Sequence, residues 1–212
     1  MNLLSAENLG KSYGERILFS DLSLGINQGQ KIGLIAQNGT GKSTLLDILS
    51  GKEPPDQGQV VYRKGLRLAY LEQEPALNPD LSVGETLFAS DLELVRILET
   101  YEKALERPED TKAYQNAYEA MERAGAWDLE TRFSQILSRL KLHDKKQKVG
   151  TLSGGQRRRL ALAHVLIEQP DLLILDEPTN HLDLEMIEWL EDYFEGQHLS
   201  LLMVTHDRYF LD

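Results

Sequence analysis

Short alternating runs of apolar and polar residues, typical of β-strands, dominate the first third of the chain. They predict a strand over residues 2–9 and one or two strands over residues 17–26. Residues 31–36, KIGLIA, form an apolar run too short for a helix, and a helical pattern over residues 43–49 follows a glycine-rich loop. Two further strands are expected, over residues 59–63 and 66–71.

The middle of the chain, residues 91–142, changes to the hydrophobic period of α-helices. The apolar face of a first helix is predicted to hold Leu92, Val95, Leu98, Tyr101 and Leu105. A second helix is expected to begin at Pro108, because proline followed by two acidic residues suits a first helical turn, and Gly125 can end it. A third helix is predicted around residues 133–140.

The last third returns to an alternation of strands and helices. Apolar runs over residues 171–175 and 199–204 have the character of buried parallel strands. Helices are predicted over residues 160–167 and 184–193. The whole pattern indicates an α/β core that a helical segment interrupts.

Residues 36–44, AQNGTGKST, match the phosphate-binding loop of nucleotide-binding proteins, with Ala36 where the first glycine usually stands. Glycine at two later positions lets backbone N–H groups turn toward a phosphate. Lys42 supplies a positive charge to the phosphates, and Ser43 can bind Mg²⁺. The residues assigned to nucleotide binding here are Asn38, Gly39, Thr40, Gly41, Lys42, Ser43 and Thr44. The alternative, a glycine-rich turn beside a surface lysine, explains neither the preceding strand nor the following helix.

Polar residues also follow two other predicted strands. Asp176 and Glu177 come directly after the first of the late apolar runs, and His206 lies just past the second. In a parallel sheet, ligands bind at the carboxyl ends of strands, so these residues are expected to face one cleft with the phosphate loop. Asp176 then suits a magnesium ion, and Glu177 is free to act as a general base. The structural alternative is a simple strand-end cap before Pro178.

Composition restricts the class of protein. The 212 residues include no cysteine, which excludes disulfides and thiolate metal sites, and no apolar stretch long enough to cross a membrane. The first ten residues lack the pattern of a signal peptide, so a cytoplasmic location without membrane insertion is expected. The formal net charge of −11 argues against general binding to nucleic acid, because phosphate contacts need Lys and Arg.

Several segments, taken with the phosphate loop, resemble motifs of the ATP-binding cassette (ABC) family over nearly the whole chain. Tyr13 resembles the aromatic residue that stacks on adenine, and Gln73 resembles the Q-loop residue, implied as a catalytic group and magnesium ligand. Leu152–Gln156, LSGGQ, resembles the ABC signature; residues 180–183 resemble the D-loop, and His206 the switch histidine. Tyr13 packing within a β-subdomain, and Gln73 as an ordinary strand-end residue, stay as alternatives.

The resemblance implies a fold and a set of ligands. The expected fold is an α/β P-loop NTPase (RecA-like) core of the ABC type, which binds ATP and Mg²⁺ and hydrolyses ATP. The expected division is a β-subdomain of residues 1–30 and 55–72, a core of residues 31–54 and 156–212, and a helical subdomain of residues 75–155. A helical hairpin arm is expected within this subdomain, at about residues 91–126.

The signature implies a second ABC domain. Ser153 is a suitable N-cap, and Gly154 and Gly155, before Gln156, let a phosphate from another domain approach the helix end. In the ABC family this surface completes the site of an opposing domain, so that two domains sandwich two ATP molecules. The partner is expected within the full protein or as a second copy of this chain, and the isolated chain is expected to be a weak ATPase.

Three segments resemble the ABC-F branch of this family: residues 178–184 (PTNHLDL), the opening LGKSYGER and the arm. Specifically, the chain resembles the N-terminal ABC domain of Uup-like members of that branch. That branch comprises soluble tandem-domain proteins of translation, whose arm and linker contact the ribosome and tRNA. The arm segment, residues 92–128, carries nine acidic against five basic residues, a net charge of −4 that is not an RNA-binding stripe. Because residue 212 follows His206 so closely, we interpret the chain as a fragment that ends after a first domain.

Other functions remain open at this point. The principal alternative is the ATP-binding subunit of a membrane transporter, which would share every catalytic residue. A DNA-repair scaffold with an ABC head is a third, although such proteins usually carry coiled-coil or zinc inserts. A basic cluster, Lys145, Lys146, Lys148 and Arg157–Arg159, is interpreted as a solvated surface.

Overall fold

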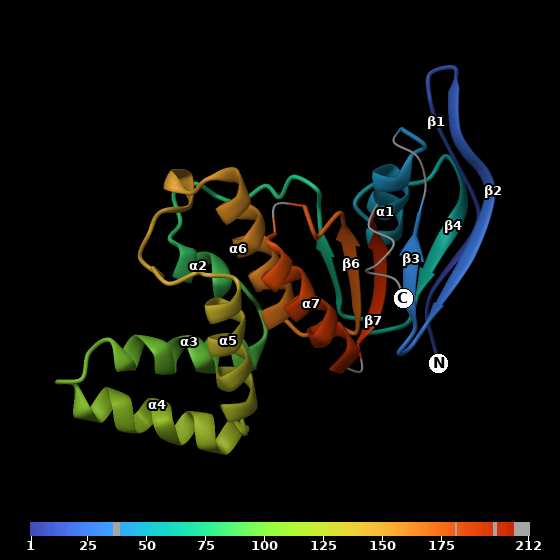
Figure 1. Ribbon diagram of the computed structural model, residues 1–212. Coiled ribbons are helices and arrows are strands. Elements are labelled where there is room, and N and C mark those ends of the chain that lie inside the picture. The colour runs from blue at the N-terminus through green and yellow to red at the C-terminus, as the bar shows by residue number, and fades with distance from the viewer. Residues whose placement is uncertain (36–38, 181, 197–198, 206–212) are drawn as a thin grey trace. The chain divides into compact units, whose positions relative to one another are not determined.

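The computed structural model describes residues 1–35, 39–180, 182–196 and 199–205. It divides into two compact units (Figure 1). The first joins Met1–Pro75 to Gln169–Asp212, and the second comprises Ala76–Glu168. The finer division of the first unit into a β-subdomain and a core, expected from the sequence, stays a prediction.

An antiparallel sheet begins the first unit, with the strand order β2-β1-β4. Its strands are β1 (Asn2–Tyr13), β2 (Arg16–Asn27) and β4 (Gln57–Tyr62). β1 and β2 form a hairpin in which Tyr13 lies opposite Arg16. Gly14, with φ of 61°, occupies the turn, a conformation that glycine adopts without a steric penalty. The pattern over residues 17–26 therefore corresponds to one strand.

A parallel sheet forms the other half of this unit, with the order β3-β7-β6-β5. Its strands are β3 (Lys31–Leu34), β5 (Leu68–Leu71), β6 (Leu172–Asp176) and β7 (Ser200–Val204). All neighbouring pairs are parallel, and Asp176 lies in register with Val204. The expected α/β fold with parallel late strands is confirmed, and the carboxyl ends of all four strands meet at one edge of the sheet.

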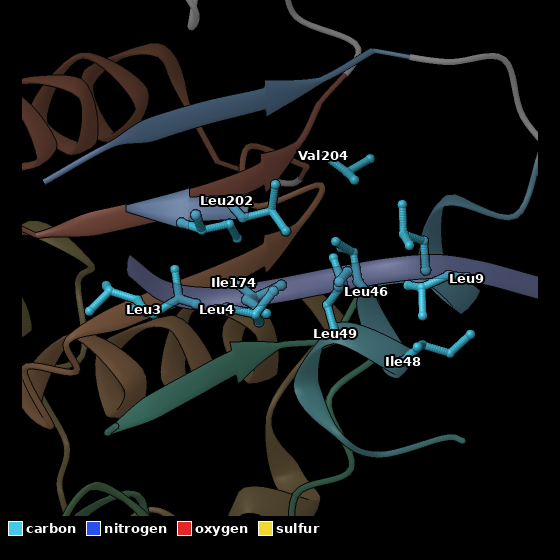
Figure 2. Close-up of a cluster of buried hydrophobic side chains, with 13 residues drawn as sticks. Leu3, Leu4, Leu9, Leu46, Ile48, Leu49, Ile174, Leu202 and Val204 are labelled. Atoms are coloured by element: carbon cyan, nitrogen blue, oxygen red, sulfur yellow. The ribbon is translucent and has the colours of Figure 1, made fainter. Parts of the chain in front are cut away.

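Helix α1 (Lys42–Ser50) and the two sheets enclose the core of the first unit. Figure 2 shows Leu46, Ile48 and Leu49 of α1 among leucines of β1 and the apolar side chains of β6 and β7. Gly51, with φ of 81°, ends α1. A second helix of this unit, α7 (Leu184–Gly196), buries one apolar face, which contains Met186, Trp189, Leu190 and Phe194. The shared core holds α1 against the strands.

The second unit is helical. It contains α2 (Val83–Leu87), α3 (Glu93–Leu105), α4 (Thr111–Ala124), α5 (Trp127–Arg139), a 3₁₀ turn (Val149–Thr151) and α6 (Gly154–Ile167). Helices α3 and α4 lie side by side as a hairpin (Figure 1), where the sequence predicts an arm. The ring of Trp127, at the start of α5, packs on Tyr101 of α3 and Tyr118 of α4, with centroids 5.2 Å apart in both pairs. These aromatic contacts tie the three helices together.

Two details of the hairpin differ from the prediction. Helix α4 begins at Thr111, not Pro108, because the Asp110 carboxylate accepts a hydrogen bond from the Ala113 N–H at 3.0 Å and caps it. Pro108 instead lies in a turn, closed by a bond from the Asp110 N–H to the Arg107 carbonyl. On α3, Leu105 is 46% exposed, because it belongs to the last turn, whereas Val95 and Leu98 are buried as expected. Gly125 ends α4 as predicted.

The basic cluster lies mostly at the surface, as the sequence predicts, and its lysines have acidic neighbours. Lys145 pairs with Glu102 of α3, Lys146 pairs at 3.0 Å with Glu106, the residue directly after α3, and Lys148 lies 3.9 Å from Glu85 of α2. Only the Lys145–Glu102 pair is partly buried, and it connects the segment before α6 to α3; the two more exposed pairs contribute little to stability.

Candidate functional site

The phosphate loop connects β3 to α1 in the first unit. Gly39 and Gly41 have φ of 77° and 91°, conformations that favour glycine. A Cβ atom on Gly41 would also come within 3.1 Å of the Cβ of Leu18. Gly41 is the N-cap of α1, which begins at Lys42, so the positive end of the helix dipole faces this loop. Ala36 and Asn38 lie outside the described residues.

A cleft of about 450 Å³ opens beside this loop. Its lining combines residues that lie far apart in the sequence: Tyr13, Leu18, Gly39, Gly41, Lys42, Ser43, Thr44, Gln73, Asp176, Glu177 and Asn180. The lining therefore includes most of the residues that the sequence predicts to bind the nucleotide, bind the metal or take part in catalysis. Thr40 belongs to the same loop without lining the cleft.

Two carboxylates enter the cleft from the end of β6. Asp176, the last residue of the strand, is 3% exposed, and Glu177 is 8% exposed. Oδ2 of Asp176 is buried and accepts no hydrogen bond from the described residues. Glu177 has φ of 51°, an unusual backbone conformation for a residue with a side chain, and its N–H donates to the Val204 carbonyl at 2.9 Å. A buried carboxylate oxygen that lacks a donor suits a cation, because burial without a partner is costly.

Tyr70, on β5, interacts electrostatically with Asp176. Burial raises the pKa of the Tyr70 hydroxyl, and the negative charges of Asp47 and Asp176 raise it further. Burial is the largest effect on the Asp47 carboxylate and raises its pKa, whereas a hydrogen bond with Tyr70 acts in the opposite direction and lowers it. Tyr70 therefore stays neutral at ordinary pH and links α1 to β5 beside the cleft.

Tyr13 is half exposed at the cleft, where its side chain is held by neighbours. Its hydroxyl donates to the Glu53 carboxylate at 2.9 and 3.0 Å. Lys11, buried to 9% exposure, pairs with that same carboxylate at 2.7 Å and lies 5.7 Å from the centre of the Tyr13 ring. One face of the ring is thus close to a cation, and the ring is anchored at its edge. Such a fixed, exposed aromatic ring can stack on a planar base.

The other predicted residues fall in different parts of the chain. Gln73, just after β5, is exposed and lines the cleft. His206 lies outside the described residues; Thr205, directly before it, is fully buried. The signature residues belong to the second unit. There Ser153 caps α6, accepting from the Gln156 N–H at 3.2 Å, while the Gln156 side chain accepts from the Ser153 N–H at 2.8 Å.

The comparison with protein families decides the identity of this arrangement. Residues 19–180, which include the phosphate loop, both carboxylates and the signature, match the model of the family described as ABC transporter. The chain belongs to this family. It is therefore an ABC nucleotide-binding domain, as the motifs indicate.

Curated relatives of this ABC domain point to one branch. It is 42% identical over its whole length to the ABC transporter ATP-binding protein YfmR of Bacillus subtilis. Over 99% of the chain it is 35% identical to the energy-dependent translational throttle protein EttA of Mycobacterium tuberculosis, and over 97% it is 38% identical to ABC transporter F family member 2 of Arabidopsis thaliana. The chain spans 35%, 39% and 32% of the lengths of these three proteins.

Solved structures support the fold of the ABC domain. An ATP-binding subunit of an ABC transporter superposes with a TM-score of 0.71, at 22% identity, over 96% of this chain and 79% of that one. A dimeric ATP-binding cassette bound to ADP and phosphate after hydrolysis gives 0.68, at 23% identity, over 98% of this chain and 90% of that one. Among the described residues, no helix has both the length and the apolar character needed to cross a membrane.

The sequence pattern predicts no role at the nucleotide site for three residues that the structure places there. Leu18 and Asn180 line the cleft, and Arg16 donates a hydrogen bond from Nη2 to the Gly39 carbonyl. Arg16 and Leu18 belong to β2, and only the pairing of β2 with β1 brings them to the loop. Asn180 lies within the D-loop motif and could have been found there.

Proposed function

We propose that this chain binds ATP together with Mg²⁺ and hydrolyses it, as the motor half of a soluble tandem ABC-F protein that acts on ribosomes. The observation that carries the ATPase proposal is the convergence of Lys42, Asp176 and Glu177 on one cleft, at the carboxyl ends of parallel strands. Phosphoryl transfer needs these groups together: a cation for the phosphates, a carboxylate for the metal and a group to orient water.

Each residue has a proposed task. The ring of Tyr13 stacks on adenine; the loop N–H groups and Lys42 hold the phosphates; Glu177 accepts a proton from the attacking water. Bound magnesium, held by Ser43, Gln73 and Asp176, directly or through water, supplies charge neutralisation at the phosphates. The buried Oδ2 of Asp176, which has no donor among the described residues, supports this assignment. His206 is proposed to contact the terminal phosphate.

The signature supports the proposal of a paired domain. Ser153 and Gln156 satisfy each other's backbone groups in a capping box. Apart from its chain neighbours and its own helix, no atom of the described residues lies within 4 Å of a Cβ built on Gly154. An anion could therefore approach the first turn of α6, where the helix dipole is favourable. The similarity to a dimeric cassette is consistent with a head-to-tail pair of ABC domains. We propose that such a partner is needed for full activity.

The translation role rests on observations other than the geometry of the cleft. It rests on similarity to relatives named for translation and for the F family, and on the hairpin of α3 and α4. The alternative, the ATP-binding subunit of a membrane transporter, is supported by the name of the Bacillus subtilis relative, an ABC transporter ATP-binding protein. A ribosome-bound protein should copurify with ribosomal subunits from native cells, whereas a transporter subunit should copurify with an integral membrane protein.

Lys42→Ala tests the nucleotide site. Removing a charge-assisted contact costs about 1.5–3 kcal/mol, which is about 10- to 100-fold in affinity for ATP by calorimetry. Lys64→Ala, an exposed lysine outside the cleft lining, is the matched control and should bind ATP like the unmodified chain. Unchanged ATP affinity in Lys42→Ala would refute the phosphate-loop assignment.

A further inference from the structure

The β1–β2 hairpin approaches the phosphate loop from outside the loop's own strand and helix. Tyr13 and Arg16 face each other across the two-residue turn. Tyr13 lines the cleft, and the guanidinium of Arg16 donates to the carbonyl oxygen of Gly39. One hairpin end therefore contacts both the proposed base-binding region and the phosphate loop.

The next residues of β2 contact the loop at a second point. A Cβ atom on Gly41 would lie 3.1 and 3.3 Å from the Cβ and Cδ1 atoms of Leu18, and 3.5 Å from Cδ1 of Phe19. At the other glycine, a Cβ on Gly39 would lie 3.4 Å from Nη2 of Arg16. Residues 16–19 thus pack closely against both glycines of the loop.

The Arg16 hydrogen bond holds the peptide unit between Gly39 and Thr40. The orientation of this unit decides whether its N–H or its C=O faces a bound anion. A trans peptide is planar, and its C=O and N–H point in opposite directions. A donor that holds the Gly39 carbonyl on the Arg16 side therefore turns the Thr40 N–H to the opposite side. The same bond keeps a partially negative carbonyl oxygen occupied, so that it does not repel a phosphate.

We propose that Arg16 is a positioning residue of the phosphate loop, which fixes the orientation of the Gly39–Thr40 peptide and keeps the Gly39 carbonyl turned away from a bound phosphate. This inference rests on the proposed ATP-binding function and deepens it. Arg16 acts through the backbone of the loop and not on the nucleotide. Its side chain is exposed, no carboxylate of the described residues forms an ion pair with it, and its bond from Nη2 goes to the loop.

Arg16→Ala, Arg16→Lys and Glu15→Ala in the 212-residue chain test the proposal. Glu15 is the matched control, because it is an exposed residue of the same turn and lines no part of the cleft. The first measurement is amide hydrogen exchange of residues 39–44 without nucleotide, on the millisecond-to-second timescale. We expect faster exchange in Arg16→Ala, partial protection in Arg16→Lys, whose ammonium can still donate one bond, and no change in Glu15→Ala.

The second measurement is calorimetric titration with ATP and with ADP, which both present a β-phosphate to the loop. A loop that is less preorganised in Arg16→Ala must be ordered on binding, which predicts about tenfold weaker binding of both nucleotides. Weaker nucleotide binding with unchanged loop exchange would overturn the proposal, since Arg16 would then act on the nucleotide itself. Unchanged binding and unchanged exchange would overturn it as well.

The two proposals fail in different ways. If the unmodified chain and Lys42→Ala bind ATP equally, the proposed function fails. If binding depends on Lys42 but not on Arg16, only the positioning role fails. Thermal melting of each variant, expected to match the unmodified chain because Arg16 is exposed, shows that the fold is intact.

Discussion

The backbone N–H of Glu177 donates a hydrogen bond to the carbonyl oxygen of Val204 at 2.9 Å. This bond continues the pairing of β6 with β7 one residue beyond Asp176, which is in register with Val204. Glu177 adopts φ of 51° there, a strained conformation that the bond and the buried surroundings help to maintain. The proposed general base is therefore held by the end of the strand that leads to Thr205 and His206.

Glu177→Gln should abolish ATP turnover while ATP binding persists. Glutamine keeps the shape of the side chain and the backbone bond to Val204, but its amide cannot accept a proton from water at neutral pH. Loss of a general base typically lowers the rate about 10²- to 10⁴-fold. Phosphate release measures turnover, and calorimetry measures binding.

Glu188→Gln, an exposed glutamate of α7, is the control for that substitution and should hydrolyse ATP at the unmodified rate. Normal hydrolysis by Glu177→Gln would show that another group serves as the base.

Asp176→Asn should remove the part of ATP affinity that depends on Mg²⁺. The buried carboxylate, whose Oδ2 atom has no donor among the described residues, would become a neutral amide, which binds a hard cation less well. Changes of this kind, in contact with a metal directly or through water, cost about 10- to 100-fold in affinity. The measurement is ATP titration with Mg²⁺ and with a chelator. An equal loss under both conditions would contradict the magnesium assignment.

Gly41→Ala should weaken nucleotide binding and also destabilise the fold. Alanine at φ of 91° would be strained, by about 1–3 kcal/mol, and its Cβ would press on Leu18 at 3.1 Å. Gly65→Ala is the matched control, since Gly65 has φ of 74° but open space around it. Both variants should melt earlier, and only Gly41→Ala should bind ATP more weakly. Equal ATP affinities would remove the steric argument for glycine at position 41.

Protonation of the Asp171 carboxylate at low pH should remove a stabilising interaction from the first unit. Burial raises the pKa of its carboxyl, but the hydrogen bond from the Arg67 N–H and the charges of Arg67 and Arg63 outweigh this and hold the pKa below the usual 3.8. The folded state therefore binds fewer protons at this carboxyl than the unfolded state. The stabilisation is complete above about pH 4 and is lost as the pH falls through the lower folded value.

Asp171→Asn removes that titration. We expect its melting temperature to fall less between pH 6 and pH 3 than that of the unmodified chain, with Glu15→Gln as an exposed control that keeps the full pH dependence. Identical pH profiles for Asp171→Asn and the unmodified chain would exclude the contribution.

Most elements follow from local sequence rules. Hydrophobic period and length separate the strands from the helices of the arm, and Gly125 ends α4 as predicted. The start of α4 shows the limit of such rules. Both Pro108 and Asp110 are typical of helix starts, and the turn closed by the Arg107 carbonyl decides between them. The short helix α2 escaped prediction because five residues cannot display a helical period.

Sequence motifs were enough to predict ATP as the ligand, because the phosphate loop, the paired acids after a strand and the signature are each contiguous and their residue types are specific. Tertiary structure alone decided which distant residues complete the cleft. Arg16, Leu18 and the Glu53–Lys11 pair that holds Tyr13 reach it only through strand pairing and chain reversal. Contacts of that kind depend on register and backbone direction, which no local pattern specifies.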